Sequence, residues 1–522
     1  MDDITNSMAA PDDAYDVLVA GYGPTGVTAA NLLGATGLRV AVVERDPAVY
    51  PRSRALVTDE EVLRVWQRTG LVGRILGQTL PDKPIGFVDD RGQLIASGEL
   101  IPRGSGYPPQ VFFHQPAVEQ ILREGVARFP NVEVLLDHEC LRVRQDSDGV
   151  DVAVTHVRQG GVRHLRASYV IAADGGSSTV RQSLGIGYAG RTYATPWVII
   201  DAEVVRPWPG QEQFRFRCDP YRPAVDCPFP PHHHRWEFPV LPDDDIRHLT
   251  SDDGVFALLA RYGVTRRHVR IQRVIAYRHH VRSAERWREG RVFLAGDAAH
   301  AMPPWLGQGL AAGVRDAANL CWKIAAVLRG ELPEEVLDSY ETERRPHVHR
   351  TAQRAAFIGR MVTERRPALA RLRNPLLKAV TGRPALYRML HEATAIPAPR
   401  YPSGLQALPR TLASGSLIPQ PWVIDPSGER VRLDDVLGQG WALLHARTLP
   451  APAQPAWERL KAPCWTVTPA QSAPAAHTVV DCDGVLLPWM AAHRAASVAL
   501  RPDAFVYATL PAPGRLPGPP GT

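Results

Sequence analysis

Residues 291–323 read RVFLAGDAAHAMPPWLGQGLAAGVRDAANLCWK, and the fold is decided in this stretch. The apolar run 291–295 is typical of a buried strand, and it ends in Gly296-Asp297. Pro303-Pro304 interrupts regular structure, and Gly307-Gln308-Gly309 opens a helical pattern. The N–H groups at a helix start attract an anion or a polarised carbonyl, and the helix dipole adds to the attraction. The stretch therefore predicts a strand, a rigid loop and a helix N-terminus arranged around an electron-rich ligand.

A dinucleotide fingerprint lies near the start of the chain. The run 16–20 (DVLVA) reads as a buried strand, Gly21-Tyr22-Gly23-Pro24-Thr25-Gly26 and a helical run follow, and a second strand, 39–43, ends in Glu44. The glycines allow the backbone to approach a pyrophosphate, and the acidic side chain accepts ribose hydroxyls. Because Glu44 would repel a 2′-phosphate, the adenosine belongs to FAD or NAD, and the fingerprint does not choose between them. The alternative is a glycine turn in an unrelated α/β domain.

A third motif, ADGGSSTVR, occupies residues 173–181 after another predicted strand. Asp174 can accept hydrogen bonds, Gly175 lets the backbone approach a ligand, and Arg181 can tie down the following helix. An ordinary turn capped by an aspartate is the alternative for this piece in isolation.

Composition excludes several classes of protein. The 522 residues are 45% hydrophobic and 22% charged, and the net charge of +6 comes without a Lys/Arg block of the kind that binds nucleic acid. No apolar run reaches the ~18–20 residues that a membrane span needs. The first fifteen residues are acidic and polar, unlike a secretory leader. The six cysteines form no C-x-x-C pair, which favours a reducing compartment over a disulfide scaffold or a metal site. We expect a cytoplasmic protein.

Two histidine clusters invite a metal-binding interpretation. His232-His233-His234 lacks spaced cysteine or carboxylate partners and follows Pro231, so we expect an exposed loop there. His279-His280 lies in a strand-like run that sends the two rings to opposite faces, so we expect a structural role. No metal site is predicted.

The three ligand motifs occur in the order and spacing typical of the class A flavoprotein monooxygenases, the FAD-dependent aromatic hydroxylases. The resemblance covers roughly Asp16 to Pro346. Within that class, the segments PPWLGQG (303–309) and DSYETERRP (338–346) look most like the 3-(3-hydroxyphenyl)propionate hydroxylases and their relatives. The last hundred or so residues are similar to the thioredoxin-like domain of phenol hydroxylase and polyketide hydroxylases, but this copy lacks C-x-x-C.

The resemblance implies an α/β fold (α+β overall) with a Rossmann-like FAD-binding domain of the p-hydroxybenzoate hydroxylase type. An antiparallel-sheet substrate domain and a C-terminal thioredoxin-like domain complete the expected architecture. The expected divisions are 1–78, 110–187 and 283–360 for the discontinuous FAD-binding domain, 79–109 and 188–282 for the substrate domain, 361–409 for a helical segment and linker, 410–510 for the thioredoxin-like domain, and 511–522 for a disordered tail.

The resemblance also assigns roles to individual residues. Pro304 would flank the reactive edge of the flavin, and Ala311 stands where many relatives have an asparagine. The implied cofactor-binding residues are Gly21, Gly23, Pro24, Thr25, Gly26, Glu44, Arg45, Arg54, Gln115, Asp174, Gly175, Asp297, Pro304, Gly307, Gly309, Leu310 and Ala311. By residue type and rough position, Tyr193 and His114 join Pro304 as catalytic candidates, and Tyr107, Arg191, Arg222 and Trp305 are candidates for the substrate site.

The implied activity is hydroxylation of a phenolic ring with O2 and NADH or NADPH, through a flavin C4a-hydroperoxide. A 3-(3-hydroxyphenyl)propionate-like acid is the expected substrate, and an aromatic polyketide is the nearest alternative. The resemblance further implies a homodimer and no nucleic-acid or membrane partner. An NAD-dependent dehydrogenase is a more distant alternative, because it leaves the motifs at Asp174 and Asp297 without a role. The second distant alternative is a flavoprotein without catalytic activity.

Overall fold

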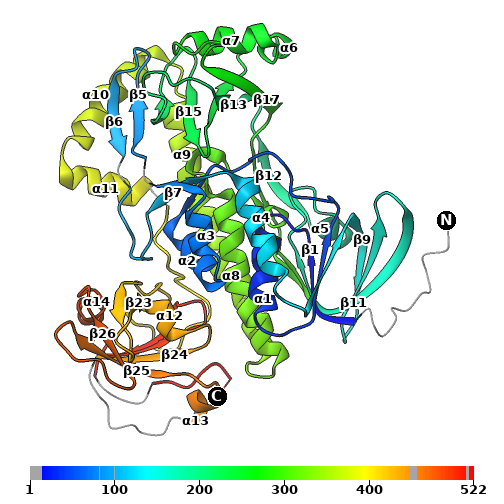
Figure 1. Cartoon of the computed structure of the whole chain (residues 1–522), viewed down its shortest axis with the longest axis vertical. Coiled ribbons are helices and arrows are strands. Elements are labelled where there is room, and N and C mark those ends of the chain that lie inside the picture. Colours follow the sequence, from blue (N-terminus) through cyan, green and yellow to red (C-terminus); the bar gives the residue numbers. More distant parts are fainter. Residues whose placement is uncertain are drawn as a thin grey trace.

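The computed structural model describes residues 14–81, 83–98, 100–394, 396–446, 455–512 and 516–521. Three sheets of seven or eight strands dominate the architecture, and the long helix α8 (Gln308–Leu328) runs between the parts that they form (Figure 1). Within the described ranges, no helix is both long enough and apolar enough to cross a membrane.

The first sheet has eight strands in the order β19-β20-β11-β1-β2-β8, extended by β10 and β9 from β11. Its centre is parallel, since β1 pairs with β2 and β11, and β11 pairs with β20, all in parallel register. Parallel strands are covered on both faces, which explains their uninterrupted apolar sequences. The strands are β1 (Ala14–Ala20), β2 (Val40–Glu44), β8 (Val132–Leu136), β9 (His138–Gln145), β10 (Val150–His156), β11 (Gly160–Ala172), β19 (Arg288–Glu289) and β20 (Val292–Leu294).

The three sequence motifs follow the carboxyl ends of neighbouring strands in this sheet. The glycine fingerprint follows β1, the Asp174 motif follows β11, and Gly296-Asp297 follows β20. Helices α1 (Pro24–Gly34), α2 (Glu60–Arg68), α4 (Gln115–Val126) and α8 pack around it. Ligands of open α/β sheets bind at this edge, outside the carboxyl ends of the strands.

The second sheet has seven strands in the order β17-β13-β16-β15-β14-β5-β6. It is mostly antiparallel, as predicted, but β14 and β5 pair in parallel, because β5 and β6 enter from an earlier part of the chain. The strands are β5 (Ile85–Val88), β6 (Leu94–Gly98), β13 (Trp197–Val204), β14 (Phe214–Arg217), β15 (Ala224–Phe229), β16 (His233–Pro239) and β17 (Val269–Tyr277). Two three-stranded sheets accompany it, formed by β3 (Val57–Asp59), β7 (Gln110–Phe113) and β4 (Thr79–Pro81), and by β12 (Tyr188–Thr192), β18 (His280–Ala284) and β21 (His300–Ala301).

The expectation of an exposed histidine loop at 232–234 is wrong for two of its three residues. His233 and His234 belong to strand β16, and His234 is fully buried with its Nε2 2.5 Å from the Asp226 carboxylate. The partner of His234 is the buried carboxylate of Asp226 on the neighbouring strand β15, and spacing along the sequence did not reveal this pair.

The C-terminal sheet has seven strands in the order β23-β22-β26-β25-β24-β27-β28. Its strands are β22 (Trp422–Ile424), β23 (Arg430–Arg432), β24 (Ala442–His445), β25 (Cys464–Pro469), β26 (Thr478–Asp481), β27 (Ser497–Leu500) and β28 (Val506–Leu510). The tail beyond β28 was expected to be disordered, and this is incorrect for its described part. Leu516 is buried, and the Pro517 carbonyl accepts a hydrogen bond from the Trp457 indole.

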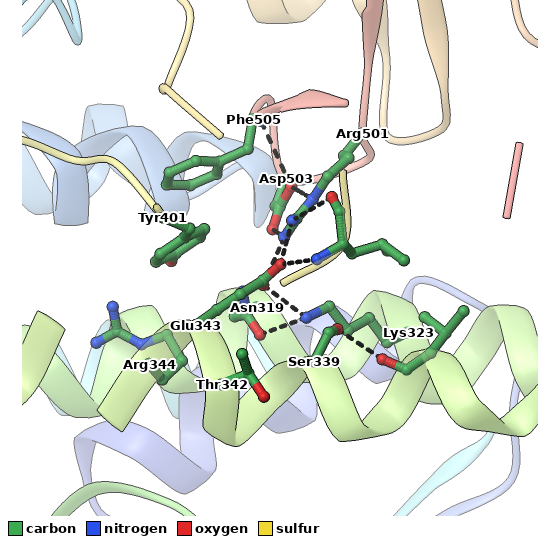
Figure 2. Close-up of polar contacts among 12 residues, drawn as sticks. Asn319, Lys323, Ser339, Thr342, Glu343, Arg344, Tyr401, Arg501, Asp503 and Phe505 are labelled. Carbon is green, nitrogen blue, oxygen red and sulfur yellow. Dashed lines mark hydrogen bonds and ion pairs between the residues drawn. The ribbon is translucent and has the colours of Figure 1, made fainter. Parts of the chain in front are cut away.

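Figure 2 shows a buried charge cluster that joins this C-terminal part to α8 and to α9 (Ser339–Val362). Its centre is Glu343, whose carboxylate lies 2.6 Å from Arg501 and 2.8 Å from Lys323. Asn319 donates to the same carboxylate, and Asp503 pairs with Arg501. The side chains of Glu343, Lys323 and Arg501 are completely buried, so each charge depends on the others for compensation.

Candidate functional site

A cavity of about 810 Å³ lies where the carboxyl edge of the first sheet meets one face of the second sheet. This volume is near the upper end of the ~300–1,000 Å³ range of ligand pockets. Helices α9, α10 (Pro367–Thr381) and α11 (Pro384–Thr394) supply further wall residues, including Ile358, Leu377 and Leu390. The lining contains eleven of the predicted cofactor-binding residues, together with Trp305: Gly23, Pro24, Thr25, Arg54, Gln115, Gly175, Asp297, Pro304, Gly307, Gly309 and Leu310.

The first end of the cavity is the N-terminus of α1. Gly23, Pro24 and Thr25 line it, and the first N–H groups of a helix have no partner within the helix. Gly26 must be a glycine, because a Cβ there would lie 1.9 Å from the Gly21 carbonyl oxygen. The turn therefore brings backbone donors and a positive dipole end to the cavity, which suits a phosphate.

The segment 53–55 forms the next part of the wall, and two neighbours hold it from opposite sides. The Gln115 side-chain oxygen accepts hydrogen bonds from the backbone N–H groups of Arg54 and Ala55, at 2.9 and 2.7 Å. On the other side, Arg235 of β16 donates to the carbonyls of Ser53 and Arg54, at 2.6 and 3.0 Å. The second sheet is thus bonded directly to a loop of the first domain.

Asp297 is held in the cavity wall by a network beneath it. The carboxylate of Asp316, fully buried in α8, accepts hydrogen bonds from the Gly296 N–H at 3.0 Å and from His300 Nε2 at 2.7 Å. These contacts fix the turn after β20, so that Asp297 faces the cavity. Desolvation raises the pKa of Asp297, while His300 and Arg54 act in the opposite direction.

The N-terminus of α8 forms the opposite wall and is anchored by a second buried network. Gly307 has φ +63°, and a Cβ there would lie 2.2 Å from Val57, so glycine is required. Gln308 donates to Asp59 at 3.0 Å and accepts from Arg315 at 3.0 Å. Arg315 also donates to both carboxylate oxygens of Asp59. The helix end that faces the cavity cannot shift without breaking these contacts.

Several predicted cofactor residues lie close to the cavity but outside its wall. The Glu44 carboxylate accepts hydrogen bonds from the N–H groups of Tyr22 and Asp46, at 2.7 and 2.9 Å, and so holds the fingerprint turn. Asp174 accepts from Val180 at 3.1 Å, and its other oxygen is buried without a partner among the described residues. Gly21, Gly26, Arg45 and Ala311 are also absent from the lining as described. Their contacts with a cofactor remain a prediction.

Five predicted catalytic or substrate residues lie outside the cavity wall. Arg222 forms two hydrogen bonds to Asp244, and Arg191 donates to the hydroxyl of Tyr193 at 3.1 Å. The hydroxyl of Tyr107 donates to Gln67, and Arg432 of the C-terminal part lies over its ring. His114 stacks against His233 with centroids 5.6 Å apart. The structure brings none of these five side chains to the cavity wall, and their roles at the site remain a prediction.

The second sheet contributes polar wall residues that sequence reasoning missed. Strand alternation places Arg273, Ile275 and Tyr277 of β17 on the cavity face, and Arg235 and Glu237 of β16 beside them. Arg278 and His279 follow β17 and also line the cavity. Alternation was visible in the sequence, but which face is turned to the ligand depends on the register between distant strands.

The cavity backbone fits the dinucleotide that the motifs predict. A Cβ added to Gly23, Gly175 or Gly309 would meet no atom within 4 Å, so at each position bare backbone is open to a ligand. Two helix N-termini and the Asp297 carboxylate therefore border one continuous space. Among the residues that the structure describes, no three His, Cys, Asp or Glu side chains are placed to hold a metal ion.

Comparison with known proteins agrees with this geometry. Residues 14–355 match the family model described as FAD binding domain, and residues 415–515 match the HcaD C-terminal domain. The chain is 35% identical over 513 residues to a 3-(3-hydroxy-phenyl)propionate/3-hydroxycinnamic acid hydroxylase of Burkholderia cenocepacia, covering 95% of this chain and 94% of the relative. It is 36% identical over 510 residues to the enzyme of that name from Mycolicibacterium smegmatis, covering 94% and 89%.

A solved structure of aklavinone-11 hydroxylase with FAD and aklavinone superimposes with a TM-score of 0.78 at 25% identity, covering 96% of both chains. The family match covers most of the chain, and the cavity is bordered by the three motifs that the match contains. The chain therefore belongs to the FAD-binding-domain family of FAD-dependent monooxygenases.

Proposed function

We propose that this enzyme hydroxylates a small phenolic acid of the 3-(3-hydroxyphenyl)propionate or 3-hydroxycinnamate type. The observation that carries the proposal is a largely apolar cavity wall that includes the guanidinium of Arg278. Arg278 lines the cavity and has no ion pair among the described residues. The relatives that match along almost the whole chain are named for substrates with a phenol and a carboxylate.

When bound, FAD supplies hydride acceptance from NAD(P)H and activation of O2. The residues of the chain bind the cofactor, orient the substrate and exclude water from the cavity. The N-terminus of α1 and Arg54 are suited to the pyrophosphate, Asp297 to the ribityl hydroxyls, and the N-terminus of α8 to the pyrimidine carbonyl of the flavin. Trp305 and Pro304 form an apolar part of the cavity wall, which would limit water near a bound aromatic ring.

A polycyclic aromatic substrate is the second candidate, and the aklavinone complex favours it. The cavity here carries Phe214, Phe216 and Trp305 on its walls, which suit several fused rings as well as one. Arg278, for which the described residues supply no ion pair, would meet no carboxylate on a neutral polyketide, so we place the phenolic acid first.

We propose that the C-terminal part is a thioredoxin-like domain, and its strand order supports this proposal. Strands β25, β24, β27 and β28 are adjacent in that order, with β24 and β25 parallel and β27 antiparallel to both of its neighbours. The chain has no C-x-x-C pair, so a structural role is proposed. The homodimer and the domain boundaries expected from the sequence also remain proposals.

The decisive experiment is anaerobic reduction of the FAD-loaded enzyme by NADH and by NADPH, with each of four additives. These are 3-(3-hydroxyphenyl)propionate, 3-hydroxycinnamate, the neutral phenol 3-ethylphenol, and aklavinone. We expect the two acids to accelerate flavin bleaching strongly and to gain one oxygen atom in aerobic turnover, as detected by mass spectrometry. Acceleration by aklavinone alone would replace the phenolic acid with a polycyclic substrate, and no acceleration by any additive would refute a substrate-gated hydroxylase.

A further inference from the structure

Glu237 occupies an unusual position on the cavity face of the second sheet. Strand register aligns one residue from each strand into a central row across this face. The row runs Ile275, Ile199, Glu237, Val225, Phe216, Phe87 and Ala96, and all seven residues line the cavity. Six of the seven side chains are apolar. A carboxylate in the middle of such a row costs free energy unless it is paired and hydrogen-bonded, so its presence there calls for a functional reason.

The neighbouring arginines are already occupied by other partners. Arg235 and Arg273 both pair with Asp201, at 2.6 Å, and both donate to the Ser53 carbonyl. The nearest Glu237 oxygen lies 3.9 Å from Arg235, beyond hydrogen-bond distance. The Glu237 side chain retains 12% of its exposure, while Arg235 retains 3%. The carboxylate therefore keeps acceptor capacity on the cavity side.

The charged surroundings of Glu237 come from three strands. Desolvation raises its pKa, Arg235 and Arg273 act to lower it, and Asp201 adds to the rise. Tyr277 and Cys227 are the other titratable groups that face it, and burial raises the pKa of both. A carboxylate with a raised pKa is a stronger base than an ordinary one. The difference between its pKa and that of the phenol is therefore smaller, which favours proton transfer from the phenol.

Two other polar groups of the wall are less suited to accept a proton. Burial raises the pKa of Tyr277, so its hydroxyl stays protonated near neutral pH and acts as a donor. His279 is neutral, because burial lowers its pKa to about 4, but its Nε2 is enclosed and without a partner in the described structure. The aromatic rings of Trp197, Tyr277 and Trp305 surround this imidazole.

We propose that Glu237 accepts the proton of the substrate's phenol during hydroxylation, an inference that rests on the function proposed above. The phenol O–H bond breaks as an O–H bond to the Glu237 carboxylate forms, and the electron pair left on oxygen raises the electron density of the ring. The ring carbon ortho to that oxygen then bonds to one oxygen atom of O2. Its hydrogen leaves as a proton, which restores aromaticity. NAD(P)H supplies the two electrons that reduce the second oxygen atom to water.

The test compares Glu237→Gln with wild type and with Glu203→Gln, a matched change at an exposed residue of the same sheet that pairs with Arg270. All three FAD-loaded proteins are reduced anaerobically and then mixed with O2 and 3-(3-hydroxyphenyl)propionate. We expect product formation per turnover to fall about 100-fold in Glu237→Gln, with H2O2 in its place, because general bases contribute ~10²–10⁴-fold. Glu203→Gln should match wild type in both flavin reduction and product yield.

The pH dependence separates proton transfer from a packing effect. In wild type, hydroxylation should decline as the pH falls through the raised pKa of Glu237, because the protonated carboxyl cannot accept a proton. Glu237→Gln should lose this acidic limb, and Glu237→Asp should keep it with a reduced rate. Fluorination of the substrate ring makes the phenol more acidic, so the loss in Glu237→Gln should shrink with a fluorinated substrate.

A Glu237→Gln enzyme with the wild-type product yield and pH profile would overturn the assignment. If Glu237→Gln fails to retain FAD, two other measurements test the same proton transfer. These are the pH profile of Glu237→Asp and the rates of wild type with the fluorinated substrates. An unchanged rate across that series would then count against proton transfer to any base. Failure of the proposed function is distinguishable, since wild type itself would then not hydroxylate the phenolic acid.

Discussion

At the scale of single residues, the partners of an arginine decide whether it can bind a substrate. Arg191 and Arg222 had the right residue type, but Arg222 is bound to Asp244 and Arg191 to Tyr193. Arg278 was not singled out in the sequence, and it lines the cavity without an ion-pair partner in the described structure. No local sequence pattern shows which residues distant in the chain form ion pairs. The sequence alone therefore could not tell which of these three arginines is available to bind a substrate.

Replacing Arg278 by methionine should weaken binding of the acid specifically. A charge-assisted hydrogen bond contributes about 1.5–3 kcal/mol, so the KM for 3-(3-hydroxyphenyl)propionate should rise roughly 10–100-fold. The KM for 3-ethylphenol, which lacks the carboxylate, should stay unchanged. Arg270→Met is the matched control, because Arg270 is exposed and pairs with Glu203. Equal KM changes for both compounds would assign Arg278 to general packing.

At the scale of elements, sequence patterns predicted the strands and helix starts that carry the cofactor motifs. Glycine spacing, an apolar strand and a terminal acid are local features, and the structure places them at the carboxyl edge of a parallel sheet. The wall formed by the second sheet was not predictable, because the central row arises from six inter-strand registers. The buried partners Asp59 and Arg315 were missed for the same reason: they lie 256 positions apart in the chain.

The anchor of α8 gives a prediction at this scale. Gln308→Met removes two buried hydrogen bonds while the ion pair of Arg315 with Asp59 stays in place. Each bond contributes about 0.5–1.5 kcal/mol, so the free energy of unfolding should fall by about 1–3 kcal/mol. The Kd for FAD, measured by flavin fluorescence, should rise at least several-fold, because the helix end that lines the cavity is less fixed. Gln120→Met, at an exposed position of α4, should change neither quantity.

At the scale of the whole molecule, the Glu343 cluster makes the C-terminal part an integral layer of the protein (Figure 2). Burial opposes ionisation of Glu343, but Arg501 and Lys323 outweigh it and lower its pKa to about 2. Since the folded-state pKa lies below the ordinary value, ionisation of Glu343 stabilises the fold above that ordinary value. This stabilisation is lost as the pH falls towards about 2.

Glu343→Gln should therefore destabilise the protein strongly. Two buried cations would lose their shared partner, at a cost of about 3–5 kcal/mol, which urea unfolding at neutral pH would measure. The difference from wild type should narrow in acid, where the wild-type carboxylate is protonated as well. The exposed Glu335→Gln is the control. A decrease of less than about 1 kcal/mol in the free energy of unfolding would show that the cluster adds little stability. Its role would then be to fix how the C-terminal part packs on α8 and α9.

The pairing of β1 with β11 has a consequence for how this chain is made. Ala14 is opposite Arg166, so the first strand leaves the ribosome long before its partner exists. At ~5–20 residues per second, it waits roughly 8–30 s, and β20 and α8 arrive later still. Arg501 follows its partner Glu343 by 158 positions and is synthesised correspondingly later. The first sheet and the Glu343 cluster are thus completed only after long stretches of chain have been made, and a ribosome that stops before then releases a chain with an open sheet edge, a substrate for chaperones and proteases.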